Sequence, residues 1–130
     1  PIPIDLIYQN NPINNKDTAI DLLFFGTQND RRKNILNKIK SKYLIHIVDN
    51  VFGSDLYNII SRSRIILNIH CFPNSILETA RINEVLGFEK LIISESVNNF
   101  DKENQQFYSD KIVFTDIISE NMVIETHLKN

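Results

Sequence analysis

Cysteine and glycine are scarce in this sequence, and each shortage excludes a class of protein. Cys71 is the only cysteine among the 130 residues, so neither an internal disulfide nor a cysteine-based zinc site can form. Only three glycines occur. The segment GTQNDRRK (residues 26–33) contains one of them and matches neither the P-loop nor the dinucleotide-binding fingerprint. The simplest interpretation of the cysteine content is a reducing, intracellular (cytoplasmic) compartment.

Long apolar runs and an excess of basic charge are also missing. No apolar run approaches the roughly 20 residues needed to cross a bilayer, and residues 1–12 lack the features of a signal peptide. The formal net charge of -2 argues against broad electrostatic binding of nucleic acid or anionic lipid. The three histidines, His46, His70 and His127, are too scattered to predict a metal site. We therefore expect no nucleic-acid partner, no membrane span and no metal.

The composition that remains is typical of one globular domain. Hydrophobic residues make up 42% of the chain and charged residues 23%, which is sufficient for a real core. The abundance of Asn and Ile suggests an AT-rich genome. Residues 1–20 are rich in Pro and Asn and predict an extended lead-in or linker, followed by a domain over residues 21–130. A chain that begins this way is expected to be one piece of a longer protein.

Five short apolar segments alternate with segments of helical periodicity. The expected strands are residues 21–26, 44–50, 64–70, 90–95 and 111–116. The expected helices are residues 29–43, 53–64, about 75–87 and 118–130, and a long polar loop over 96–110 has room for a helical turn. The expected N-caps are Asn29 or Asp30, Ser54 or Asp55, and Asn74 or Ser75.

Strands that are apolar on both faces belong in a parallel sheet with helices on each side. Right-handed crossovers then predict an α/β fold, a Rossmann-like open, doubly wound parallel sheet of about five strands with helices on both faces. Ligands of such sheets bind beyond the carboxyl ends of the strands. The residues expected at that edge are Gly26, Thr27, Asp49, Asn50, His70, Ser94 and Glu95.

The first candidate site is the turn after the first strand. Gly26 allows a tight turn and close approach of a ligand, and the helix that follows offers free N–H groups. Arg31, Arg32 and Lys33 place cations in the first turn, where they oppose the helix dipole, and a bound phosphate would offset that cost. A solvated basic face is the alternative interpretation.

The second candidate is the helix expected near residues 75–87. Glu78, Arg81 and Glu84 fall within an arc of about 120° on this largely apolar helix. Glu78 with Arg81, and Arg81 with Glu84, have the spacing of helical ion pairs, so a structural ladder of ion pairs is one interpretation. The other is that Arg81 or Glu84 also faces a polar ligand.

Two neighbouring residues at the end of the third strand are single candidates. His70 and Cys71 point in different directions and make a poor catalytic dyad. Cys71 is interpreted as packing, whereas His70 is well placed to contact a ligand. The pair Phe107 and Tyr108 is expected to anchor the long loop to the core.

Three segments together resemble a known family. DLLFFGTQNDRRKNIL, FGSDLYNIISRSRIILNIH and ILETARINEVLGFEKLIISE, within residues 21–116, are similar in order and spacing to the nucleotide-sugar-binding C-terminal half of GT-B fold group-1 type glycosyltransferases. The similarity is greatest to the bacterial and viral type with an R-x-x-E helix. The resemblance implies a hexosyltransferase whose donor is a nucleotide-diphosphate sugar, with no cofactor and no metal, which suits a sequence without a D-x-D pair.

The resemblance also implies roles for particular residues. Glu84 matches the acidic residue that binds the ribose hydroxyls, and Arg81 matches the arginine of the R-x-x-E pattern. Gly26, Thr27, Arg31 and Arg32 match the loop and helix start that neutralise phosphate charge, and His70 matches a polar position near the donor. The glutamate expected eight positions before Glu84 is replaced by Ile76. His70 and Glu78 are therefore only weak candidates for catalysis.

A complete enzyme of this family has two such domains, so the resemblance implies a second Rossmann-like domain. That domain would bind the acceptor, which is a glycan, a protein or a small molecule, and the present domain alone is expected to be inactive. Two alternatives stay open. One is a non-catalytic module for protein contact or regulation, including a receiver-like version with Asp49 as phospho-acceptor. The other is a different nucleotide-using enzyme on the same architecture.

Overall fold

The computed structural model describes residues 19–73, 75–119 and 122–129 of the chain. The expected lead-in over residues 1–20 therefore lies outside the described residues except for its last two. Asn74, one of the two expected caps of the fourth helical segment, also lies outside them.

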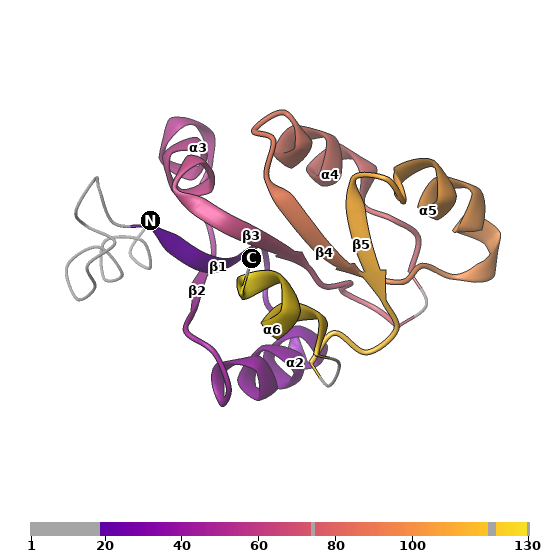
Figure 1. Cartoon of the computed structure of the whole chain (residues 1–130), viewed down its shortest axis with the longest axis horizontal. Coiled ribbons are helices and arrows are strands. Elements are labelled where there is room, and N and C mark those ends of the chain that lie inside the picture. The colour runs from indigo at the N-terminus through magenta and orange to yellow at the C-terminus, as the bar shows by residue number, and fades with distance from the viewer. Residues whose placement is uncertain (1–18, 74, 120–121, 130) are drawn as a thin grey trace.

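Five parallel strands form one open sheet in the order β2-β1-β3-β4-β5 (Figure 1). Each pairing between neighbours is parallel, so all five carboxyl ends meet at one edge. This arrangement confirms the predicted α/β, Rossmann-like sheet. The strands are β1 (Ile20–Phe25), β2 (Ile45–Val48), β3 (Ser63–Asn68), β4 (Leu91–Glu95) and β5 (Ile112–Thr115).

Helices cover both faces of the sheet, as Figure 1 shows. Side chains alternate along β1, so that Leu23 and Phe25 face one cluster while Leu22 and Phe24 face the other. The first face is covered by α3 (Gly53–Ser61), α4 (Thr79–Leu86) and α5 (Lys102–Tyr108), and the second by α2 (Asp30–Lys40) and α6 (Val123–Leu128).

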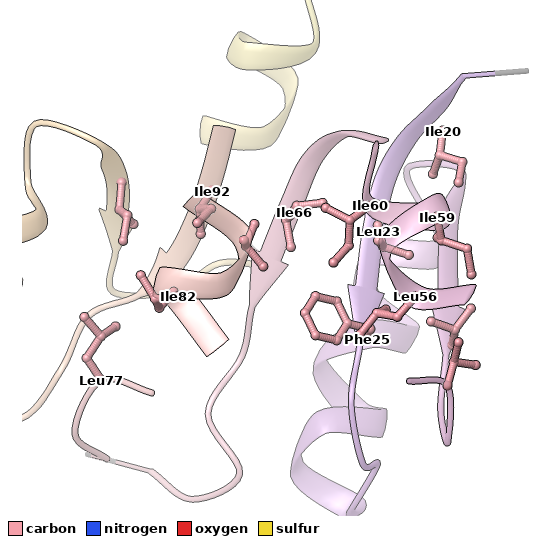
Figure 2. Packing of buried hydrophobic residues seen from close by; sticks show 14 of the residues in the cluster. Ile20, Leu23, Phe25, Leu56, Ile59, Ile60, Ile66, Leu77, Ile82 and Ile92 are labelled. Atoms are coloured by element: carbon pink, nitrogen blue, oxygen red, sulfur yellow. The ribbon is translucent and has the colours of Figure 1, made fainter. Parts of the chain in front are cut away.

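The packing under α3 and α4 holds the loops of the carboxyl edge in place. Figure 2 shows Leu56, Ile59 and Ile60 of α3 beside Leu23 and Phe25 of β1. Ile82 of α4 and Ile66 and Ile92 of the sheet belong to the same cluster, each 2% exposed or less. Burying one such side chain contributes about 1.5–3 kcal/mol, so the starts of both helices are firmly positioned.

The start of α4 and the N-cap of α3 differ from the sequence prediction. α4 begins at Thr79, not near residue 75, and Glu78 occupies its N-cap position without a side-chain cap. Ser75, expected as a cap, instead donates a hydrogen bond to the Phe72 carbonyl at 2.7 Å. α3 begins at Gly53 with Phe52 at its N-cap, so neither Ser54 nor Asp55 caps it. The Asn29 cap of α2 is as predicted, since its side chain accepts from Arg32 N–H at 2.9 Å.

The long polar segment after β4 is more ordered than expected. It contains a 3-10 turn, η2 (Asn99–Asp101), followed directly by α5. Tyr108 is buried and anchors the segment, whereas Phe107 is 74% exposed and does not. Within the described ranges, none of the helices is both long enough and apolar enough to span a bilayer.

Candidate functional site

Two cavities lie along the carboxyl edge of the sheet. The first, here called the Arg81 cavity, has a volume of about 240 Å³, and its lining includes Phe25, Gly26, Asp49, Phe52, Arg81 and Glu84. The second, the His70 cavity, has a volume of about 310 Å³, and its lining includes Arg31, His70, Glu95, Ser96, Lys102 and Asp116. They lie where an open parallel sheet binds its ligands.

The predicted site residues are divided between these cavities. Gly26, Thr27, Arg81 and Glu84 line the Arg81 cavity, so segments more than 50 residues apart in the chain do converge there. Arg31 and His70 line the His70 cavity instead. Arg32 is 2% exposed and is not among the lining residues of either cavity. The seven residues therefore do not share one cavity.

Arg81 is held in the first cavity by two unusual contacts. Its guanidinium carbon lies 5.2 Å from the centre of the Phe25 ring, an arrangement that favours a cation over an aromatic face. It also packs against Gly26, where an added Cβ would lie 2.7 Å from Nη2 of Arg81. Gly26, at φ +136°, thus makes room for this arginine, a role that the sequence did not reveal.

The charge of Arg81 is poorly compensated. Its Nη1 is buried without a hydrogen-bond partner, and in the described part of the chain Arg81 forms no ion pair. Desolvation by burial, followed by the nearby charge of Arg32, lowers the pKa of Arg81. A buried donor without a partner costs about 1–3 kcal/mol. An anion in the cavity would compensate the positive charge of the guanidinium.

Glu84 stands at the mouth of the same cavity, in the last turn of α4. It is exposed, and its Oε2 accepts a hydrogen bond of 2.9 Å from the hydroxyl of Tyr57 on α3. This hydrogen bond raises the pKa of Tyr57. Tyr57 orients the carboxylate, and sequence reasoning missed it because nothing local connects residues 27 positions apart.

Arg31 forms a bidentate ion pair with Glu95 at this edge. Its two terminal nitrogens donate to the two oxygens of Glu95 at 2.8 and 2.6 Å, and Nη1 also donates to the His70 carbonyl at 2.7 Å. The hydrogen bond to Glu95 raises the pKa of Arg31. Such a bidentate pair fixes the guanidinium geometrically. The predicted contact of Arg31 with a phosphate group stays a prediction. In the structure, the carboxylate of Glu95 accepts the hydrogen bonds that a phosphate would accept.

Arg32 connects two loops. Its Nε donates to the Ile69 carbonyl at 2.9 Å and its Nη1 to the Thr27 carbonyl at 2.6 Å. Its guanidinium also lies 5.3 Å from the centre of the Phe24 ring. These contacts satisfy a buried charge with backbone oxygens, so Arg32 holds together the segments that follow β1 and β3. A phosphate role for Arg32 likewise stays a prediction.

Buried His70 pairs with half-buried Glu78. Nδ1 of His70 lies 3.0 and 3.1 Å from the two oxygens of Glu78, while Nε2 lies 3.0 Å from the Ser96 carbonyl. Because both ring nitrogens face acceptors, the imidazole is satisfied only when it carries both protons. Burial opposes that charge, but the hydrogen bond to Glu78 and its charge, the Ser96 carbonyl and the charge of Glu95 together raise the pKa of His70.

Glu78 is held as a carboxylate by its neighbours. Burial alone would raise its pKa, but hydrogen bonds from His70 and from Asn68 Nδ2, the latter at 3.0 Å, lower it to about 2. Glu78 precedes α4, so the predicted helical arc of three charges is wrong, and its ion pair is with His70, not Arg81. Buried Asn68, which also donates to Ser94 at 3.0 Å, is a second residue that the sequence did not single out.

Metal binding finds no support in the described residues, among which no group of three or more His, Cys, Asp or Glu side chains could hold an ion. Comparison with known proteins adds no further constraint on the site. No protein-family model matches the chain, and neither a curated protein nor a solved structure is significantly similar to it.

Proposed function

We propose that the chain is the donor-binding domain of a glycosyltransferase and that it holds the nucleotide part of a nucleotide sugar in the Arg81 cavity. The observation that carries this proposal is the half-buried guanidinium of Arg81, whose Nη1 has no hydrogen-bond partner, in a cavity that is also lined by Glu84. A cation that lacks a partner and a carboxylate at the rim suit a ligand with both phosphate and hydroxyl groups.

Each part of the cavity has a role in this proposal. Arg81 neutralises a phosphate through charge-assisted hydrogen bonds, and Glu84, oriented by Tyr57, accepts hydrogen bonds from ribose hydroxyls. Phe52 is 75% exposed and lines the same cavity, so its ring is available to contact the base. Val51 and Leu56 extend that apolar wall.

In the transfer reaction, negative charge grows on the leaving phosphate as the bond to the sugar breaks. A fixed guanidinium stabilises that charge where it develops, without reorganisation at the moment of reaction. His70 and Glu78 satisfy each other in the structure, so we assign them no proton transfer. The acceptor and its activating base belong to a second domain, and the present domain is inactive without it.

Ligand-induced stabilisation tests the proposal. UDP or GDP at millimolar concentration should raise the melting temperature of the full chain, because a ligand that binds only the folded state stabilises it. Glu84→Gln should remove most of that shift. The matched control is Glu103→Gln, an exposed carboxylate on α5 away from the cavity, which should keep the shift. No shift with either nucleotide would contradict the proposal.

A non-catalytic protein-contact module is the second candidate, and exposed apolar side chains favour it. Phe100 in η2 is 98% exposed, and Phe72 and Ile76, in the segment after β3, are 69% and 60% exposed. Large exposed apolar groups often mark interaction surfaces. Sedimentation that shows a concentration-dependent dimer, together with no nucleotide binding, would favour this candidate over the first.

A further inference from the structure

We propose that the Arg81 cavity binds a single phosphate group, so that this chain does not discriminate a nucleoside diphosphate from the monophosphate. The inference rests on the proposed function. It concerns how much of the donor this domain recognises. It follows from which arginine side chains are already paired within the protein and from the carboxylates that line the cavity.

The two other arginines of the candidate site are engaged within the protein. Arg31 donates hydrogen bonds from both terminal nitrogens to the Glu95 carboxylate. Arg32 donates to the backbone carbonyls of Ile69 and Thr27. Of these three arginines, within the part of the chain that the structure describes, only Arg81 lines the cavity, and its Nη1 has no hydrogen-bond partner. One guanidinium matches one phosphate group.

Carboxylates oppose a second phosphate at the same place. Asp49 and Glu84 both line the cavity, so its lining carries two acidic groups against the one arginine. The first turns of α2 and α3, which start at this edge, contain Asp30 and Asp55. Two like charges 4 Å apart repel by about 1 kcal/mol even in water, so a second phosphate would gain little by entering.

The size of the cavity agrees with partial recognition. Its volume of about 240 Å³ is below the range of roughly 300–1,000 Å³ that is usual for pockets that enclose a whole small-molecule ligand. The cavity therefore holds one phosphate and part of the nucleoside, while any second phosphate and the sugar extend beyond its mouth.

Calorimetric titration of the full chain with uridine, UMP and UDP, and with the guanosine series, tests this inference. We expect the two phosphorylated forms to bind within about threefold of each other and at least about tenfold more tightly than the nucleoside. Arg81→Gln should abolish the advantage over the nucleoside. Arg64→Gln is the matched control, because Arg64 is exposed at the amino end of β3 and pairs with Asp21.

A second variant tests the repulsion itself. Asp49→Asn removes one carboxylate from the lining and should increase the affinity for UDP relative to UMP by about fivefold. If wild-type protein binds the diphosphate at least about tenfold more tightly than the monophosphate, the inference is overturned while the proposed function stands. If none of the six probes binds, both are overturned.

Discussion

At the residue scale, Arg81 is the feature that stability alone does not explain. A guanidinium that is largely withdrawn from water, with Nη1 unpartnered, disfavours folding. The Phe25 ring offsets only part of that cost, since a cation over an aromatic face contributes about 0.5–2 kcal/mol. Sites that bind ligands commonly retain such unfavourable groups, and their replacement tends to stabilise the protein at the expense of function.

Arg81→Met should therefore raise the free energy of unfolding by about 1 kcal/mol, because the desolvated charge disappears while its apolar contacts largely remain. Urea denaturation measures the change, and UMP should no longer stabilise the variant. Arg64→Met, at an exposed ion pair, serves as the control and should change stability by less than about 1 kcal/mol. A clear loss of stability in Arg81→Met would show that the arginine has a structural role.

At the element scale, the end of β1, the turn that follows it and α4 pack together and line the Arg81 cavity. Gly26 ends β1 with its N–H bonded to the Val48 carbonyl at 3.1 Å, and it adopts a positive φ that favours glycine. The absence of a side chain at Gly26 is what lets the α4 arginine reach the turn. The turn and the helix are thus fitted to each other although they are far apart in sequence.

Gly26→Ala should destabilise the protein by about 3 kcal/mol, because the new methyl group combines an unfavourable φ with a clash against Arg81. In an Arg81→Ala background the loss should be smaller by about 1 kcal/mol, since only the backbone term remains. Wild type, the two single variants and the double variant form a double-mutant cycle. Urea denaturation of these four proteins measures the coupling free energy between positions 26 and 81.

Gly53→Ala is the matched control for that cycle. Gly53 also has positive φ, at +62°, but no atom lies within 4 Å of an added Cβ. Its substitution should cost only about 1–2 kcal/mol for the left-handed backbone and should show no coupling to Arg81. Equal costs of Gly26→Ala in both backgrounds would contradict the proposed fit between the turn and α4.

At the scale of the whole molecule, two buried histidines give opposite contributions to the dependence of stability on pH. The pKa of His70 is raised above its ordinary value of 6.5, so its stabilising contribution is complete below that value and is lost as the pH rises through the raised pKa. Burial lowers the pKa of His46, so stability falls as the pH drops below 6.5, where the unfolded chain binds a proton more readily.

The wild-type protein should accordingly lose stability as the pH rises above 6.5, and His70→Gln should lack that loss. Urea denaturation at several pH values measures the slope. His46→Gln is the comparison variant: it should retain the loss above pH 6.5 and lack the loss below it. An unchanged slope in His70→Gln would show that the imidazole does not carry its predicted charge.

The sheet was predictable from the sequence because its cause is local. Apolar runs such as LLFF in β1 and IIL in β3 are buried on both faces, and a parallel sheet covered by helices buries such runs. The boundaries of α4 were less predictable. Residues 75–78 have helical periodicity, but Glu78 bonds to His70 and Asn68, and these tertiary contacts override the local preference.

The candidate site was predictable only in part. The resemblance suggested that Gly26, Arg81 and Glu84 belong to one site, and all three line the same cavity. The resemblance does not indicate which cationic side chains are left without an ion-pair partner. In the sequence, Arg31 and Arg81 were equally good candidates for contact with a ligand. In the structure, Arg31 pairs with Glu95, which lies 64 residues away.

The sequence by itself determined the order of strands and helices and the edge at which a ligand would bind, since apolar periodicity and chain direction specify these locally. Only the tertiary structure decided which charges are compensated and which are left exposed to a ligand. An ion pair such as Arg31–Glu95 depends on distances of a few ångströms between side chains that are remote in sequence. No periodicity in the sequence encodes those distances.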